Sequence, residues 1–260
     1  MTRLGESKVG RKFLTYLASA ALTFNAIAYV PAADAMTVQP VVIDLKQAGN
    51  GMTQIITVEN TFATPLPVEL RVQSLELDEN GVKQTGKDNG DLLIFPPQAL
   101  IQPGQTQTFR VQYVGDPDLK ASKHYYVTVA QLPVKLPAGQ SAIQILYNFQ
   151  VLVSIAPVGA KPAVAIQSAT IGHNSAGKPV PVLIVTNPSA AHGYLSGGRL
   201  RLIQRDAAGK EVMRRTMSGP EVQQTIGFGL IGSNQTRRMM LPIELPVDGG
   251  TIEASFTADG

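Results

Sequence analysis

Apolar and polar residues alternate along most of the chain after residue 36, and the longest such stretch lies in the middle. From Ala142 to Pro157 the sequence reads AIQILYNFQVLVSIAP, with no charged residue and no Gly. Its odd positions are all apolar, namely Ile143, Ile145, Tyr147, Phe149, Val151, Val153 and Ile155. A period of two predicts a β-strand, because successive side chains of a strand point to opposite faces. At ~3.3 Å per residue this strand would be about 50 Å long, well beyond the usual length.

A strand of this length has two explanations. It is either a long interior strand, or a strand that leaves part of its apolar length for another chain. An uncovered apolar strand is an aggregation hazard unless a partner normally pairs with it. The rest of the sequence must decide between the two.

The residues before this stretch show shorter runs of the same kind. Turn signals such as Gly49-Asn50-Gly51, Asp78-Glu79-Asn80-Gly81 and Pro103-Gly104 separate them. We expect a polar loop over 83–91 and strands over Thr37–Leu45, Met52–Asn60, Val68–Leu77, Leu92–Ile101 (interrupted at Pro96-Pro97), Thr106–Val114 and Tyr125–Leu132. Seven strands with turns about every ten residues and no amphipathic helix predict an immunoglobulin-like β-sandwich.

The second half of the chain is also predicted to be β, in a smaller sandwich with a weaker pattern. Its expected strands are Val164–Ile171, Val180–Thr186, Tyr194–Gln204, Glu211–Met217, Ile226–Ile231, Thr236–Leu241 and Ile252–Phe256. The fold class is therefore all-β, with an N-terminal domain over 36–157, a short linker over 158–162 and a C-terminal domain over 163–260.

Residues 1–35 are typical of a cleaved secretory signal peptide. A basic start is followed by a mostly apolar run from Phe13 to Val30 and by the small-x-small site Ala33-Asp34-Ala35. The alternative is a transmembrane anchor, which the polar residues within the run and the cleavage site disfavour. No later segment has ~18 continuous apolar residues, so we expect no membrane insertion after cleavage.

Charge and cysteine content restrict the possible partners and the covalent bonds that could stabilise the fold. Removal of residues 1–35 leaves 18 basic and 17 acidic residues, a net charge of +1. The basic balance of the whole chain is thus partly the signal, and nucleic acid is not an expected partner. The chain has no cysteine, so no disulfide holds an exported fold together.

Candidate chemistry is sparse. His124, His173 and His192 lack a second ligand at metal spacing, and no Ser or His lies in a nucleophile context. We therefore expect no enzyme activity, metal or cofactor. A basic cluster runs from Arg199 to Arg215, in which Arg199, Arg201 and Arg205 share one strand face. It is either a solvated sheet face or a contact surface for an acidic partner.

Several motifs together resemble the PapD-like periplasmic chaperones of chaperone–usher pili. The most specific is the run from Ile94 to Gly104, IFPPQALIQPG, followed by Arg110 and Tyr113. The other motifs are Ile56-Thr57-Val58-Glu59-Asn60, Val129-Ala130-Gln131-Leu132-Pro133, Ser154-Ile155-Ala156-Pro157 and Val185-Thr186-Asn187-Pro188-Ser189. The likeness covers about 220 residues and is strongest in the first domain.

The resemblance implies two immunoglobulin-like domains joined at an angle, located in the periplasm. It also implies pilus subunits (pilins) as clients, which the chaperone binds by donor-strand complementation and delivers to an outer-membrane usher. The donor strand would be 142–156, and Ile143, Ile145 and Tyr147 would be the donated side chains, with Phe149 continuing the row if no bulge intervenes. The alternative for these residues is the domain's own core, which we expect for Val151–Ile155.

The chain departs from this family in the residues that hold the C-terminal carboxylate of the subunit. Well-known members hold the subunit's C-terminal carboxylate with an Arg and a Lys, but neither Thr37–Leu45 nor Ala142–Pro157 contains a basic residue. We therefore expect a divergent, archaic-type member. Substitute anchors could be Arg110 or Lys123, or less favourably Arg71, each of which could equally be a solvated surface cation.

Two rival functions remain open from sequence. One is a secreted two-domain structural or adhesion β-sandwich without clients, and the other is a family member that assembles a non-pilus surface polymer. A chaperone free of client could also self-associate through its unfinished edge.

Overall fold

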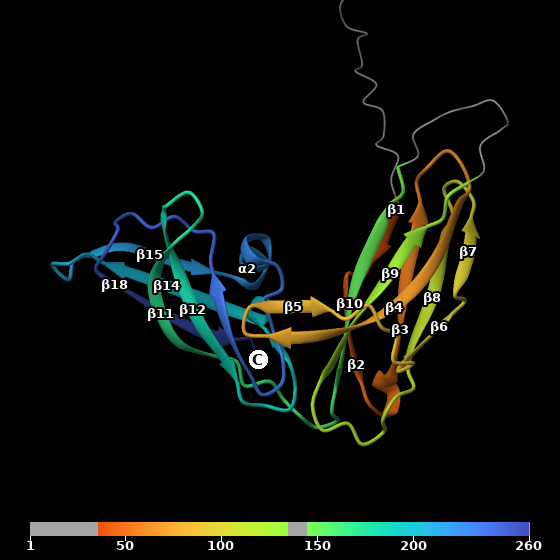
Figure 1. Ribbon diagram of the computed structural model, residues 1–260, viewed down its shortest axis with the longest axis horizontal. Coiled ribbons are helices and arrows are strands. Elements are labelled where there is room, and N and C mark those ends of the chain that lie inside the picture. Colours follow the sequence, from red (N-terminus) through yellow and green to blue (C-terminus); the bar gives the residue numbers. More distant parts are fainter. Residues whose placement is uncertain (1–35, 135–144, 260) are drawn as a thin grey trace, which may run out of the picture. The chain divides into compact units, whose positions relative to one another are not determined.

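The computed structural model describes residues 36–134 and 145–259, and the predicted signal peptide lies outside them. The described chain is mostly β-strand and forms two β-sandwiches, the first before Pro157 and the second after Pro162 (Figure 1). This confirms the predicted all-β, two-domain fold. No helix among the described residues has the length and apolar content needed to cross a membrane.

The first sandwich consists of two sheets. One has the order β1 (Met36–Gln39), β3 (Thr53–Asn60), β8 (Thr106–Tyr113) and β6 (Leu92–Phe95). The other has the order β2 (Val42–Lys46), β10 (Asn148–Ala156), β9 (Lys123–Gln131), β4 (Leu66–Asp78) and β5 (Gly81–Gln84), with β7 (Gln98–Ile101) also paired to β4. A 3-10 turn, η1, spans Gly49–Met52.

The core of the first sandwich follows from the alternation in sequence. Residues two apart on a strand face the same side, so the apolar positions of both sheets meet between them. The fully covered side chains include Ile56 and Val58 of β3, Phe109, Val111 and Tyr113 of β8, Val127 and Val129 of β9, and Val151, Val153 and Ile155 of β10.

The predicted strand Thr37–Leu45 is in fact two strands in different sheets. β1 pairs antiparallel with β3 of the first sheet, whereas β2 pairs parallel with β10 of the second. Pro40 and Val41 connect them, and Pro40 has no N–H with which to continue a ladder. Pro96-Pro97 separates β6 from β7 in the same way, since β6 pairs with β8 and β7 with β4.

Two further expectations for this domain need correction. The predicted loop over 83–91 begins with strand β5, which forms a hairpin with the end of β4. The predicted long strand is regular only from Asn148, because β9, its neighbour, is a strand only as far as Gln131. Residues 135–144, including part of that prediction, lie outside the described residues.

The second sandwich has two three-stranded sheets. One contains β11 (Ala165–His173), β12 (Pro179–Asn187) and β17 (Gln235–Met240), and the other β15 (Glu211–Met217), β14 (Gly198–Arg205) and β18 (Thr251–Ala258). The short strands β13 (Gly193–Tyr194) and β16 (Leu230–Ile231) pair with each other, and the 3-10 turn η2 spans Leu195–Gly197. Leu183, Leu200 and Leu202 lie at the centre of its core.

The expected strand Ile226–Ile231 is wrong in its first part, because Ile226 ends a helix, α2 (Gly219–Ile226). Ser218 and Glu221 form a reciprocal capping box: the Ser218 N–H donates to Glu221 Oε2 at 2.8 Å. This arrangement satisfies amide groups that a helix start leaves free. Pro220 in the first turn favours the same start. Only Leu230 and Ile231 of the expected strand form β16.

The two sandwiches are connected by residues 157–164, since β10 ends at Ala156 and β11 begins at Ala165. They also contact each other at the β4–β5 hairpin. The amide of Arg238 in β17 donates to the Glu79 carbonyl at 2.9 Å, and Gln235 Nε2 donates to the Asp78 carbonyl at 2.7 Å. The proposed domain boundaries at 157 and 163 stay predictions.

Candidate functional site

Strand β10 is paired along nearly its whole length on one edge, but along only part of its length on the other. Its pairing with β9 runs from Asn148 to Ile155. Its pairing with β2 begins only at Leu152, opposite Val42. The part of β10 before Leu152 therefore has an edge without a partner strand among the described residues.

The backbone direction shows which groups face this edge. The Leu152 N–H donates to the Val41 carbonyl at 3.0 Å, on the β2 side. Backbone groups alternate along a strand, so the N–H and C=O groups of Gln150 and Asn148 point to the same side as those of Leu152. They form a short template of unpaired donors and acceptors. The cause is the chain's change of sheet at Pro40, which takes β1 away to β3.

The apolar row of β10 leaves the core as it runs towards this open edge. Val151, Val153 and Ile155 are completely covered, as predicted for this domain's own core. Phe149 is partly buried against that core. Tyr147 is 38% exposed and contacts the Phe62 ring at 5.9 Å, whereas Ile145 is 69% exposed. The row thus passes from core to surface.

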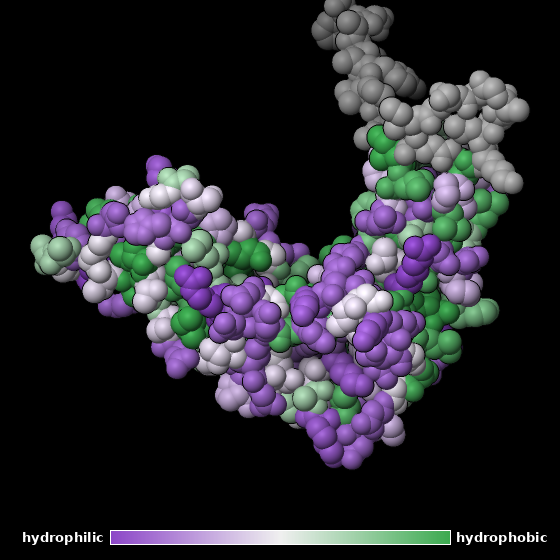
Figure 2. Space-filling model, viewed as in Figure 1, coloured by the Kyte–Doolittle hydropathy of each residue, from purple (hydrophilic) through white to green (hydrophobic). Residues whose placement is uncertain are grey.

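Ile145 and Leu146 are exposed apolar residues just before β10. Figure 2 shows hydrophobic residues at the upper end of the first sandwich, near the place of the label β1 in Figure 1. Ile143, the first residue of the expected donor set, lies outside the described residues. We refer to the exposed end of the row, Ile145–Tyr147, together with the free backbone edge of Asn148 and Gln150, as the open edge.

The two proposed anchor cations lie away from the open edge. Arg110 is exposed on β8, in the other sheet, and donates to Gln112 Oε1 at 2.9 Å. Lys123 starts β9 opposite Ile155, at the far end of β10. Both side chains form their polar contacts elsewhere, Arg110 with Gln112 and Lys123 with Asp91, and the anchor role of both stays a prediction.

Lys123 instead belongs to a small polar cluster around Asp91. Lys123 Nζ lies 2.9 Å from Asp91 Oδ2, which also accepts a short hydrogen bond from the Tyr125 hydroxyl. Burial raises the pKa of Asp91, but these two hydrogen bonds and the ammonium charge outweigh it and hold that pKa below its usual value. Burial and the hydrogen bond to Asp91 raise the pKa of Tyr125.

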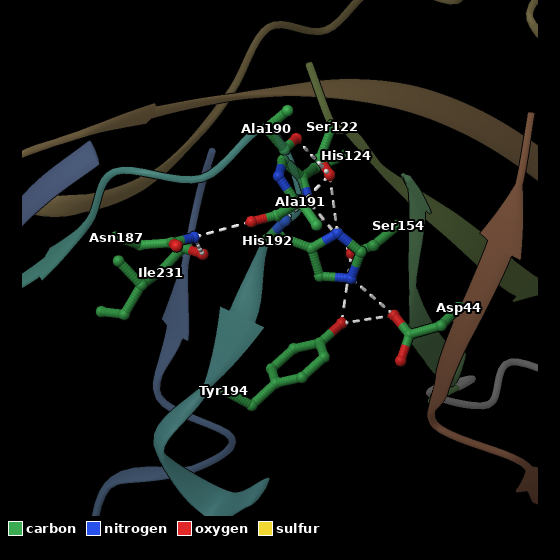
Figure 3. A network of polar contacts seen from close by, with 10 residues as sticks. All are labelled: Asp44, Ser122, His124, Ser154, Asn187, Ala190, Ala191, His192, Tyr194 and Ile231. Carbon is green, nitrogen blue, oxygen red and sulfur yellow. Dashed lines mark hydrogen bonds and ion pairs between the residues drawn. The ribbon is translucent and has the colours of Figure 1, made fainter. Parts of the chain in front are cut away.

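A second polar network, which we did not find from sequence, connects the two sandwiches (Figure 3). His192, almost fully buried, lies 2.8 Å through Nε2 from Asp44 Oδ1 and 2.9 Å through Nδ1 from Ser122 Oγ. The Tyr194 hydroxyl donates to Asp44 Oδ1 at 2.8 Å, and its oxygen lies 3.2 Å from Ser154 Oγ. We call Asp44, Ser122, Ser154, His192 and Tyr194 the joint network.

The electrostatics of the joint network fix a negative charge on Asp44. Burial raises the pKa of this carboxyl, but hydrogen bonds from His192 and Tyr194 and nearby positive charge bring it below its usual value. A carboxylate only accepts hydrogen bonds, so the Nε2 of His192 donates to it. Ser154 lies on β10, and the network therefore connects the strand of the open edge to the second domain.

His124 borders this network. Its Nδ1 lies 2.9 Å from Ser154 Oγ and its ring contacts that of His192 at 5.2 Å. Burial, followed by the charge of His192, lowers the pKa of His124 to about 3. This imidazole is therefore neutral at ordinary pH.

No local sequence signal could reveal the joint network, because Asp44 and His192 are 148 positions apart. The Asn187-Pro188 turn, which the sequence did indicate, supports it from the second domain. Asn187 is completely buried, and its Nδ2 donates to the carbonyls of Ala191 at 2.7 Å and Gly232 at 2.9 Å. These bonds hold the segment that carries His192.

The basic cluster of the second domain lies on one outer face, as its spacing predicted. Arg199, Arg201 and Arg205 alternate with covered residues on β14. Glu253 lies 3.7 Å from Arg205, and Glu211 pairs with Arg214. Two of the cations of the cluster, Arg205 and Arg214, are thus paired with neighbouring carboxylates.

Comparison with known protein families finds a match for the first domain. Residues 35–161 match the family described as pili and flagellar-assembly chaperone, PapD N-terminal domain. No curated protein sequence matches the chain.

Three solved structures illustrate the likeness of the whole fold. The CsuC–CsuE chaperone–tip subunit complex of Acinetobacter baumannii archaic Csu pili is 14% identical, with a TM-score of 0.51, over 86% of this chain and 93% of that one. The structure of the Salmonella enterica SafA pilin in complex with the SafB chaperone is 14% identical, with a TM-score of 0.51, over 88% of this chain and 92% of that one. The class 5 fimbriae chaperone CfaA is 12% identical, with a TM-score of 0.50, over 86% of this chain and 100% of that one.

The match over residues 35–161 covers all strands of the first sandwich, β1 to β10. The first domain of this chain belongs to the PapD-type pili and flagellar-assembly chaperone family, and the chain as a whole is PapD-like.

Proposed function

We propose that this chain is a periplasmic chaperone that binds pilus subunits by donating strand β10, through residues 142–149, and delivers them to an outer-membrane usher. The observation that carries the proposal is the open edge, where unpaired backbone groups of Asn148 and Gln150 adjoin the exposed Ile145 and Tyr147. An extended segment of a partner can add to such an edge, with ladder bonds giving affinity and alternate side chains giving specificity.

The free energies expected from side-chain burial and ladder hydrogen bonds are large enough for a binding strand. Completely burying an exposed Ile or Tyr-sized side chain contributes roughly 1.5–3 kcal/mol. Because Ile145 is 69% and Tyr147 38% exposed, covering the rest of both contributes about 1.5–3 kcal/mol before ordering costs. Each ladder hydrogen bond adds about 0.5–1.5 kcal/mol. Val151–Ile155 anchor the strand in its own core, which keeps the donated part extended and lowers the entropy lost on binding.

The comparisons support this reading of the open edge. Two of the similar structures are described as complexes of a chaperone with a subunit, CsuC with CsuE and SafB with SafA. The signal-like residues 1–35 support export to the periplasm.

The test is co-expression with the pilus subunit encoded beside this chain's gene. We expect Ile145→Asp to reduce the recovered subunit at least tenfold, because a carboxylate would be buried against an apolar groove. Val114→Asp is the matched control, since Val114 is also about half exposed but lies in a loop after β8. Equal recovery with both variants would contradict donation by this strand.

A chaperone free of client should also associate with itself through the open edge. Sedimentation at rising concentration should show a dimer in the wild type and less of it in Ile145→Asp. A wild-type monomer at high concentration would remove self-association from the account without affecting client binding.

A further inference from the structure

A small cavity of about 270 Å³ lies beside the joint network, where the two sandwiches and the segment between them meet. Its lining comes from the last residues of β2 and β10, from the connecting residues 157–164, and from β13 and β18 of the second domain. Asp44, His192 and Tyr194 of the joint network form part of its wall. Because the open edge lies at the start of β10 and this cavity at its end, the proposed client contacts do not use the cavity.

Most of the lining is apolar. Val164 and Phe256 of the lining also pack against the core of the second sandwich. Gly193 allows the connecting segment to approach closely, since a Cβ there would lie 2.6 Å from Val164 Cγ2 and 2.8 Å from Pro162 Cβ. At Gly197, in contrast, an added Cβ would meet no atom within 4 Å. An apolar enclosure with a few polar groups is typical of sites for small molecules.

Three ionised side chains line the cavity without pairing with one another, namely Asp44, Lys46 and Asp259. Asp44 uses only Oδ1 for His192 and Tyr194, and Figure 3 shows no contact to its other oxygen. Among the described residues, neither the Lys46 ammonium nor the Asp259 carboxylate forms a hydrogen bond or ion pair. Asp44 and Lys46 are two apart on β2, so both side chains leave the strand on the same side. Opposite charges that face one cavity without touching leave room for a ligand that carries both signs.

We propose that this cavity binds a small zwitterion with an apolar side chain, namely a free hydrophobic α-amino acid. Its ammonium donates to Asp44 Oδ2, its carboxylate pairs with Lys46, and its side chain packs against Val164 and Phe256. A simple amine would face the like charge of Lys46, and a simple acid those of Asp44 and Asp259, which makes either a poorer ligand. The inference is independent of the proposed function, because none of these residues belongs to the open edge.

Isothermal titration of the protein with racemic phenylalanine tests the proposal. Phenethylamine, which lacks the carboxylate, and hydrocinnamate, which lacks the ammonium, have the same apolar body and serve as comparison ligands. We expect phenylalanine to bind at least tenfold more tightly than either. Equal or weaker binding of phenylalanine would overturn the proposal, as would the absence of measurable binding.

Charge variants identify the cavity as the site. Lys46 and Lys83 are both exposed on strands of the same sheet, but only Lys46 lines the cavity. Lys46→Met should weaken phenylalanine binding at least tenfold without weakening that of phenethylamine, and Lys83→Met should change neither. Asp44→Asn should weaken the binding of both ligands. Should Asp44→Asn fail to fold, Lys46→Met still decides, because Lys46 has no polar partner among the described residues. Equal affinity of the Lys46→Met and Lys83→Met proteins for phenylalanine would refute this site.

Discussion

At the scale of single residues, His124 shows how burial sets chemistry in this protein. Its ring is enclosed beside the joint network, where Ser154 contacts Nδ1, and its Nε2 has no hydrogen-bond partner among the described residues. A protonated ring here would be close to His192, while Asp44 compensates only in part, so the pKa falls to about 3.

This burial makes the protein less stable in mild acid. Between pH 6.5 and about 3 the unfolded chain carries a proton on His124 that the folded chain lacks, so the free energy of unfolding falls as the pH drops. From pH 7.5 to 5 this group alone should cost about 2 kcal/mol. Urea unfolding should show this loss in the wild type, and a loss smaller by about that amount in His124→Asn. If the free energy of unfolding fell equally with pH in both proteins, the result would contradict the burial of a neutral His124.

Sequence reasoning on residues succeeded where the signal was local. The alternation of Val151, Val153 and Ile155 identified core positions, because a strand repeats every two residues. It failed for His192, which we considered only as a possible metal ligand, and for Asp44, which the sequence analysis did not single out. Their pairing depends on the folding of two domains, and no spacing within the chain encodes it.

At the scale of elements, proline positions decide where strands end. Pro40 divides a run that alternation alone presents as one strand, and its two parts join different sheets. That division creates the open edge, because β2 begins too late to cover the start of β10. The sequence showed the proline, but not that the chain crosses between sheets there, which depends on both sheets being present.

Helix α2 was missed for a different reason. Ile226, Leu230 and Ile231 resemble a short apolar strand, and short apolar runs cannot be assigned by periodicity alone. The signal that was available is the pair Ser218 and Glu221 at capping-box spacing, with Pro220 between them.

At the scale of the whole molecule, the joint network connects β10, the strand of the open edge, to the second domain. Asp44 and Ser154 belong to β2 and β10, and the Tyr194 hydroxyl contacts both: it donates to Asp44 and lies 3.2 Å from Ser154 Oγ. His192 adds a nearly buried contact to Asp44. Groups that share one buried partner usually depend on one another energetically.

A double-mutant cycle tests this dependence. Asp44→Asn and His192→Gln, alone and combined, should show a coupling energy of about 1–3 kcal/mol in urea unfolding, because each variant leaves the other group without its partner. The control pair is Asp118 and Lys120, both highly exposed, whose coupling should stay below about 1 kcal/mol. Equal coupling in the two pairs would mean that the joint network does not hold the domains together.

The central claim, that a client strand pairs with the open edge of β10, is tested most directly by amide hydrogen exchange. In the free protein the amides of Asn148 and Gln150 should exchange quickly, whereas those of Phe149 and Val151 are protected by β9. On binding of the subunit encoded beside this chain's gene, the Asn148 and Gln150 amides should slow at least a hundredfold while the other two change little. Binding that leaves the Asn148 and Gln150 amides exchanging as in the free protein would contradict the account.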